Sequence, residues 1–246
     1  MNVVSTRRQQ YLDALGITRW VPRLGAAEPS LVSRNTTIVS PAPVALKPSP
    51  DAEIDSSAWA ELETAVRGCT KCSLHATRTQ TVFGVGHRQA RWMFIGEAPG
   101  ADEDRQGEPF VGRAGQLLNA ILFAIGLKRE EVYIANVLKC RPPGNRDPQP
   151  EEVAQCEPYL LRQIELIKPR LIVALGRHAA HSLLKTEVPL GKLRGQRLSY
   201  HGTPLIVTYH PAYLLRNPAD KRKVWDDLCL ARKAMASLTD PEEGKS

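Results

Sequence analysis

The feature that most constrains the fold is a regular alternation of short apolar runs with amphipathic helical patterns. The apolar, β-prone runs are residues 92–95, 132–138, 170–175 and 204–209. The helical patterns are residues 113–125, 150–167 and 177–185, with a last one over roughly 219–237. Strands that alternate with helices build a mostly parallel sheet with helices on both faces, so each strand is apolar along its whole length. The expected fold class is α/β, in a three-layer α/β/α arrangement.

Two end segments lie outside this alternation. Residues 1–57 contain a short amphipathic pattern at 9–20 and a proline-rich stretch at 41–50, which is typical of an extended linker. We expect residues 1–57 to be a disordered or weakly structured N-terminal extension, residues 58–240 to form the globular domain, and residues 241–246 to be a tail.

The charge of the chain favours a polyanionic partner. The 246 residues carry a formal net charge of +7, and residues 58–246 hold 27 Lys and Arg against 21 Asp and Glu. Such a surplus favours binding to nucleic acid, although many basic proteins bind none. No segment approaches the roughly 18 apolar residues of a membrane span, and the first ten residues lack the apolar core of a secretory signal. We therefore expect a cytoplasmic protein that does not contact the membrane.

The unusual residues gather where the predicted strands end, which is where parallel sheets bind ligands. The stretch GEAPGADEDRQGEPFVGRAGQLLN, residues 96–119, follows the first strand and combines five glycines with two prolines and a run of carboxylates. Glycines let the backbone approach a ligand closely and aim N–H groups at it. The carboxylates either form a solvated loop or bind a divalent cation for phosphoester hydrolysis. Phe110 is either a core residue or a platform for a flat ring.

Two polar residues at strand ends are candidates for ligand binding. Asn136 stands inside an apolar strand, where an amide is costly unless it is hydrogen-bonded. It either bonds a neighbouring loop or reads the edge of a planar base with its carbonyl and amino groups. His210 follows the last strand and precedes a proline, which raises its standing as a functional residue. His178 and His181 are interpreted as ordinary helix residues.

The segment HPAYLLRNP, residues 210–218, is interpreted as a loop. Tyr213, Leu214 and Leu215 are followed there by Arg216. Core packing explains part of this apolar content. An apolar wedge beside phosphate-binding cations is also what extrusion of a base from a duplex requires.

Four of the five cysteines can converge on one site. Cys69 and Cys72 form a Cys-x-x-Cys turn after a helix, and Cys140 and Cys156 flank a proline-rich loop. Such a set suits Zn²⁺ or a [4Fe-4S] cluster, and the spacing does not choose between them. Cys229, inside a helical pattern, is expected to be a buried core thiol.

As a set, these motifs resemble the family 4 uracil-DNA glycosylases, the iron–sulfur type, over residues 58–238. The resemblance rests on GEAPGADEDRQGEPFVGRAGQLLN, on YIANVLKCRPPGNRDPQPEEVAQC, on HPAYLLR and on the four cysteines. It implies a base-excision repair enzyme that hydrolyses the N-glycosidic bond of uracil in single- or double-stranded DNA and leaves an abasic site. Covalent relatives carry a KRRIH insertion where RPPGNRDPQPEE stands here, so the implied enzyme is monofunctional.

The resemblance also implies roles for individual residues. The implied ligands of a structural [4Fe-4S] cluster are Cys69, Cys72, Cys140 and Cys156. The implied pocket residues are Glu97 and the Ala98 backbone at the water and base pocket, Glu103 against the thymine methyl group, Phe110 under the flipped uracil, Asn136 at its Watson–Crick edge, and His210 as donor to uracil O2. Glu97 would position water or support the cationic sugar. The implied DNA contacts are Tyr213, Leu214, Leu215 and Arg216.

Two other functional classes stay open. A metal-dependent nuclease or phosphoesterase would use the acidic loop, but the sequence shows no second carboxylate cluster at another strand end. An iron–sulfur redox module would need an electron partner. We expect the chain to act as a monomer on uracil-containing DNA, with a repair or replication protein as a candidate partner of the N-terminal extension. The range of bases accepted is left open.

Overall fold

The computed structural model of the chain describes residues 50–238, and the side chains of residues 57–238. The expectations for residues 9–20, 41–49 and 241–246 lie outside the described residues. A compact unit begins at Pro50. The first described helix, α2 (Pro50–Arg67), therefore begins several residues before position 58, the expected start of the globular domain.

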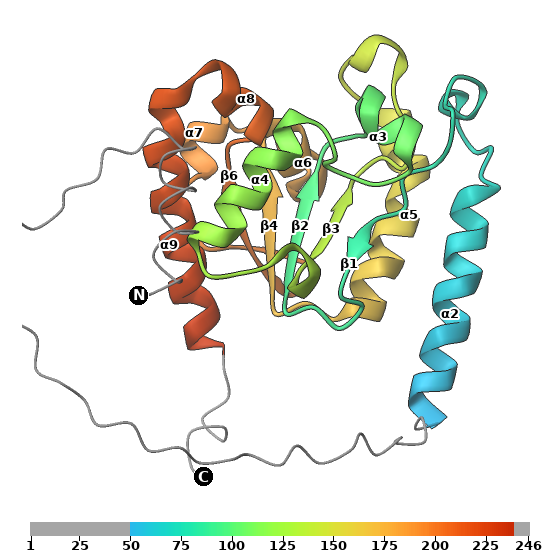
Figure 1. Cartoon of the computed structure of the whole chain (residues 1–246), viewed down its shortest axis with the longest axis horizontal. Coiled ribbons are helices and arrows are strands. Elements are labelled where there is room, and N and C mark those ends of the chain that lie inside the picture. Colours follow the sequence, from blue (N-terminus) through green and yellow to red (C-terminus); the bar gives the residue numbers. More distant parts are fainter. Residues whose placement is uncertain (1–49, 239–246) are drawn as a thin grey trace, which may run out of the picture. The chain divides into compact units, whose positions relative to one another are not determined.

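Six strands form one sheet at the centre of this domain (Figure 1). They are β1 (Val85–Gly86), β2 (Trp92–Gly96), β3 (Tyr133–Asn136), β4 (Leu171–Leu175), β5 (Leu198–Tyr200) and β6 (Thr203–Thr208). Their order across the sheet is β1-β3-β2-β4-β6-β5. The four inner strands are parallel, whereas β1 and β5 pair antiparallel at the two edges. The predicted mostly parallel sheet is confirmed.

Helices cover both faces of the sheet and complete the three predicted layers. One face packs against α4 (Arg113–Ala124), α8 (Pro211–Arg216) and α9 (Lys221–Ser237). The other face packs against α5 (Pro150–Ile167), α6 (Arg177–Leu184) and α7 (Leu190–Leu193), and α2 adds Trp59 to the same core. Short 3₁₀ helices lie in the connections at Ser73–Ala76, Arg129–Glu131, Pro143–Asn145 and Pro218–Asp220.

The inner strands are apolar because both of their faces are buried. In β2, Met93 and Ile95 pack in the core beneath α5 and α6, while Phe94 packs in the core beneath α4 and α9. All three side chains are fully buried. Burial of an apolar side chain of this size contributes about 1.5–3 kcal/mol, so both faces of each inner strand stabilise the fold.

The structure differs from the sequence-based expectation at four short elements. Two segments that we expected to be loops contain helices, α3 (Ala101–Gln106) and α8. The edge strands β1 and β5 are two and three residues long, too short for an alternating pattern to show. None of the helices in the described part of the chain is both long enough and apolar enough to cross a membrane.

Candidate active site

A cavity of about 730 Å³ opens at the carboxyl ends of the parallel strands. Its walls come from the segments that follow β2, β3, β4 and β6, so a single hollow gathers residues that are far apart in the sequence. The predicted site residues on its lining are Glu97, Ala98, Glu103, Phe110, Asn136, His210, Tyr213 and Arg216. Leu214 and Leu215 are outside that lining.

Asn136 is the last residue of β3 and is 2% exposed. Its Oδ1 atom is buried and has no hydrogen-bond partner among the described residues. Gly96, at the end of the neighbouring strand β2, permits this placement, because a Cβ there would overlap Oδ1 of Asn136. An unpaired buried carbonyl costs about 1–3 kcal/mol, so it is primed to accept a donor from a ligand in the cavity.

Phe110 lies beside Asn136 in an uncommon backbone conformation. Its φ is +55°, in the left-handed region that side chains with a Cβ rarely adopt. Gly115 in the first turn of α4 makes room for this conformation, since a Cβ on Gly115 would overlap the carbonyl oxygen of Phe110. The Phe110 ring is buried and lies 5.4 Å from the His210 ring, with 30° between the planes. This strained backbone conformation therefore places the Phe110 ring on the cavity lining.

His210 caps the N-terminus of α8, where Pro211 occupies the first helical position. The Nδ1 atom of His210 accepts a hydrogen bond from the backbone N–H of Ala212 at 3.1 Å. Burial and, to a smaller extent, the nearby Arg216 lower the pKa of His210 to about 4. The imidazole is thus neutral at pH 7, and because Nδ1 accepts, the proton is on Nε2. His210 is a fixed, uncharged donor.

Glu97 follows β2 and shares the cavity wall with two residues from other segments. One ligand atom each of Glu97, Asp147 and His178 lie within 4.8 Å of one another. Burial and, to a smaller extent, the Asp147 carboxylate raise the pKa of Glu97 to about 7, against an opposing effect of Arg177. Near neutral pH this carboxyl group is therefore divided between its two protonation states, as suits a group that handles a proton.

Asp147 reaches this position because its loop is anchored on both sides. Its carboxylate lies 3.2 Å from Nε2 of His178 and 3.7 Å from Nη2 of Arg177, both on α6. The preceding residue, Arg146, forms a two-pronged ion pair with Glu152 in α5, at 2.9 and 2.5 Å. The loop between β3 and α5 is thus tied to two helices, beside the cavity.

Asp147 and His178 are not among the site residues predicted from the sequence. His178 was interpreted as an ordinary helix residue, yet it lines the cavity. It comes two residues after Gly176, at the end of β4, and Asp147 comes in the connection that leaves β3. The strand-end rule, applied to β4, points to His178, whereas Asp147 lies 11 residues after the end of β3 and has no such signal.

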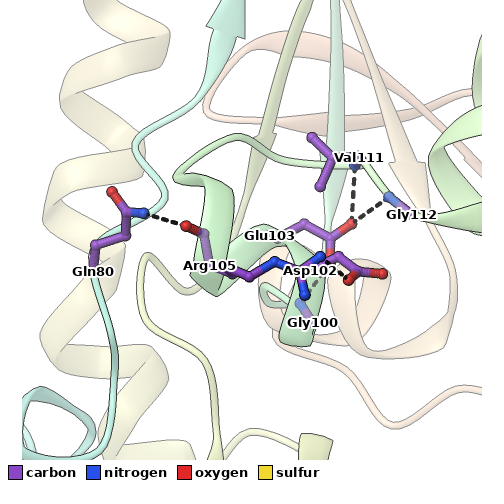
Figure 2. A network of polar contacts seen from close by, with 7 residues as sticks. All are labelled: Gln80, Gly100, Asp102, Glu103, Arg105, Val111 and Gly112. Carbon is purple, nitrogen blue, oxygen red and sulfur yellow. Dashed lines mark hydrogen bonds and ion pairs between the residues drawn. The ribbon is translucent and has the colours of Figure 1, made fainter.

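Glu103 braces the loop rather than projecting freely into the cavity (Figure 2). One carboxylate oxygen accepts from the backbone N–H of Gly100 at 3.1 Å, and the other accepts from Val111 at 3.0 Å and Gly112 at 3.2 Å. The side chain therefore joins the turn after β2 to the backbone that follows Phe110. A carboxylate that accepts several N–H bonds makes charge-assisted contacts of about 1.5–3 kcal/mol each.

The four predicted DNA contacts are of three kinds in the structure. Leu214 is 1% exposed and packs in the core with α9. The prediction that Leu214 contacts DNA is therefore wrong. Helix α8 turns Leu214 inward because its period is 3.6 residues, whereas the predicted loop had no such constraint. Leu215 and Arg216 are exposed. Tyr213 lines the cavity. Its hydroxyl donates to the Asp220 carboxylate at 2.6 Å, and its ring stacks on Tyr209.

The four predicted metal-binding cysteines come together beside α2 and α5. Cys69, Cys72, Cys140 and Cys156 line one small hollow, and none of them is in a disulfide. Two donors point at their sulfur atoms: Nη1 of Arg78 lies 3.1 Å from Cys140, and the backbone N–H of Lys139 lies 3.2 Å from Cys156. Cys229 is half-buried in α9 and does not line this hollow.

Comparisons with known proteins agree with this geometry. The family model of the uracil DNA glycosylase superfamily matches residues 83–229, more than half of the chain and all of the cavity lining. The type-4 uracil-DNA glycosylase of Archaeoglobus fulgidus is 50% identical over 161 residues, which are 62% of this chain and 81% of the relative. The chain belongs to the type-4 uracil-DNA glycosylases.

Further relatives with that name have similar coverage. The protein of Thermotoga maritima is 48% identical over 66% of this chain and 87% of its own length. That of Saccharolobus solfataricus is 45% identical over 70% of this chain and 84% of its own length.

Proposed function

We propose that the cavity of this type-4 enzyme binds a uracil base flipped out of DNA and hydrolyses its N-glycosidic bond. Uracil-DNA glycosylase activity, hydrolysis of an N-glycosyl bond in DNA repair, is the activity of its family. The observation that carries the placement is the unpaired buried Oδ1 of Asn136 next to the Phe110 ring. Uracil offers N3–H to that oxygen and O4 to the amide nitrogen, while its flat ring stacks on Phe110.

Glycosidic cleavage places negative charge on the departing uracil and positive charge on the deoxyribose. His210 is the donor for the anion, because its Nε2–H is uncharged, buried and held in one orientation by Ala212. A fixed donor aimed at developing charge contributes about 3–4 kcal/mol in enzymes of known mechanism. The imidazole stabilises O2 of uracil and does not need to change its charge.

Glu97 acts on the sugar side of the bond. As a carboxylate it stabilises the cationic deoxyribose and orients the water that attacks C1′. Its raised pKa leaves it able to take the proton that this water releases near neutral pH. The Ala98 backbone, which follows Glu97 on the wall, completes the water and base pocket.

The proposed selection of uracil over thymine depends on the rigidity of the cavity rim. Glu103 lines the cavity and holds both Gly100 and the backbone after Phe110. We infer that this bracing keeps the pocket too narrow for the 5-methyl group of thymine. The role assigned to Glu103 is therefore exclusion through a fixed loop.

The DNA backbone is proposed to contact α8. Leu215 is an exposed apolar side chain at its end, and the exposed Arg216 follows it on the cavity rim. Together they supply the wedge and the cation that hold an extruded nucleotide in place. Tyr213 shapes the entrance from the same helix. Action as a monomer, a cytoplasmic location and a protein partner for the N-terminal extension stay predictions.

The cysteine hollow is proposed to hold a structural [4Fe-4S] cluster. Four cysteines that line one hollow suit either Zn²⁺ or a [4Fe-4S] cluster, and we infer the cluster from the resemblance to the iron–sulfur type of this family. The donors from Arg78 and Lys139 suit thiolate ligands. A cluster there would join α2 and α5 and would take no part in breaking the glycosidic bond.

The test is excision from a labelled oligonucleotide that contains one uracil, incubated in EDTA and then treated with alkali. We expect strand breakage only after alkali, because a glycosylase leaves an abasic site that is intact until base treatment.

His210→Ala and Asn136→Ala should each reduce the single-turnover rate by at least about 10²-fold at unchanged thermal stability. Direct strand breakage that requires Mg²⁺ would instead establish the nuclease alternative, and near-normal rates in both variants would contradict the pocket assignment.

A further inference from the structure

Lys139 is a charged residue in the interior that the proposed mechanism does not use. It follows β3 by three residues and is 2% exposed. Its Nζ atom donates to the backbone carbonyl of Asn136 at 2.9 Å and to Oε1 of Gln163 at 2.7 Å. Burial of an ammonium group costs free energy. We therefore looked for a role of Lys139 that an apolar side chain could not fill.

The acceptor Gln163 is itself fixed on its far side. It is fully buried in α5, and its Nε2 atom donates to the carbonyl of Phe83 at 2.9 Å and to the Tyr133 hydroxyl at 3.2 Å. Because both ends of the Gln163 amide are bonded, Oε1 has one orientation, toward Lys139. The ammonium group is thus held by a rigid polar chain that begins in α5.

The main chain of Lys139 belongs to the cysteine hollow. Its backbone N–H donates to the sulfur of Cys156, the next residue is Cys140, and Lys139 lines the same hollow as both. Both of its side-chain acceptors are neutral, and no carboxylate of residues 57–238 forms an ion pair with it.

We propose that Lys139 is a positioning residue for base reading: its ammonium group fixes the main chain of Asn136, so that the Asn136 amide faces the uracil edge. The inference rests on the proposed function of Asn136. Two anchors, Gln163 on one side and the cysteine hollow on the other, hold Lys139 itself. The same residue thereby links the wall of the cysteine hollow to the floor of the base pocket.

The test measures inhibition of excision by free uracil in a double-mutant cycle. Lys139→Met keeps the length and apolar stem of the side chain and removes the donor. We expect the inhibition constant of uracil to rise about tenfold, a loss of about 1.4 kcal/mol of binding. In an Asn136→Ala background the same substitution should change that constant less than twofold, because Lys139 then has no amide to position.

The cycle also separates positioning from a general loss of structure. Tyr133→Phe is the matched control, since it removes the hydroxyl at the far end of the same chain and leaves Asn136 untouched; its inhibition constant should equal that of the unaltered protein. Iron per chain and the visible absorbance should be unchanged in Lys139→Met, because the four cysteines and the backbone N–H remain. If Lys139→Met yields no folded protein, Lys139→Gln enters the same cycle.

Two results would overturn the inference. One is an unchanged uracil constant in the Lys139 variant, and the other is an equal rise with and without the Asn136 amide. The unaltered protein is measured first, so that a failure of the proposed function appears separately as absence of uracil excision. Loss of iron in the variant at an unchanged uracil constant would assign Lys139 to the cysteine hollow alone and would also overturn it.

Discussion

Glu97 and His210 show the same physical effect with opposite signs. Burial raises the pKa of the carboxyl group to about 7 and lowers that of the imidazole to about 4, because a poorly solvated site favours the neutral form of each. Between pH 5 and pH 8 the protonation of His210 does not change, whereas Glu97 passes from mostly neutral to mostly ionised. Of these two groups, therefore, only Glu97 changes its charge substantially in this range.

We predict that the single-turnover rate rises with pH through about 7 and then levels off. The sign follows from the proposed role, because the ionised carboxylate stabilises the sugar cation and its fraction grows as the pH passes the raised pKa. Glu97→Gln should lower the rate by about 10²–10⁴-fold and remove the rise. Asp147→Asn should move the rise to lower pH, since Asp147 is one cause of the raised pKa. A rise that persists in Glu97→Gln would assign it to another group.

Asp147 is an example of a site residue that the sequence alone does not predict. Asn136, Phe110 and His210 could be selected because an amide inside an apolar strand, an aromatic between glycines and a histidine at a strand end are each unusual locally. Asp147 and His178 have ordinary local contexts, an exposed loop and a short helix. Only the packing of α6 beside the connection from β3 brings them together with Glu97.

At the scale of elements, the cavity depends on how closely α4 approaches the backbone of Phe110. Gly115 allows this approach, because any side chain there meets the Phe110 carbonyl. The N-terminus of α4 and the strained backbone of Phe110 are therefore packed directly against each other. Their contact places the aromatic ring against His210.

We predict that Gly115→Ala destabilises the fold by about 1–3 kcal/mol and greatly reduces excision, since α4 or Phe110 must move. Gly191→Ala is the matched control. Gly191 lies in α7, and a Cβ there has no neighbour within 4 Å, so alanine should be neutral or stabilising by up to about 1 kcal/mol. Thermal unfolding and single-turnover kinetics of the two variants give the comparison; equal behaviour would show that the close approach is unimportant.

The Glu103 brace gives a second prediction at this scale. Glu103→Ala leaves three backbone N–H groups without their acceptor, so we expect a loss of about 2–4 kcal/mol of stability and a higher ratio of thymine to uracil excision. The neighbouring Asp102→Asn removes only an exposed ion pair with Arg105 and should change either quantity little (Figure 2). Unchanged discrimination against thymine in Glu103→Ala would contradict the proposed role of the brace.

Long apolar or amphipathic segments were predictable, and short ones were not. The parallel strands and α5 follow from runs of buried residues, and the predicted helix over 150–167 has the bounds of α5. The six-residue helices α3 and α8 contain too few residues to show a period. In α3 the flanking Gly100 and Gly107, which cap the helix, are typical of loops in the sequence. The short edge strands lack a pattern for the same reason.

At the scale of the whole molecule, the domain begins with α2. Trp59 is 1% exposed and packs against Phe83 and Tyr133, while Leu62 and Val66 pack beside the cysteine hollow. The helix thus serves both the main core and the proposed cluster site. The sequence predicts a helix that ends before the Cys69–Cys72 turn, but the start of that helix, in a proline-rich stretch, has no clear signal.

We predict that removal of residues 1–49 leaves thermal stability unchanged and the excision rate on a short oligonucleotide within about twofold, because the compact unit starts at Pro50. Removal of residues 1–67 should instead cost at least about 3–5 kcal/mol through loss of the buried Trp59, and it should lower iron per chain. Calorimetry and iron analysis of both truncated proteins test this. A large loss of activity in the shorter deletion would place an essential function in the first 49 residues.

The edges of the sheet have a consequence for the behaviour of the protein in concentrated solution. Each edge is a single antiparallel strand, of two residues in β1 and three in β5, while the long apolar strands lie between them. An edge strand is where a second chain can add to a sheet and begin aggregation, and a short edge offers few free backbone groups for it. The strands with the greatest tendency to aggregate are thus shielded by the ones with the least, which favours a protein that remains dispersed when crowded.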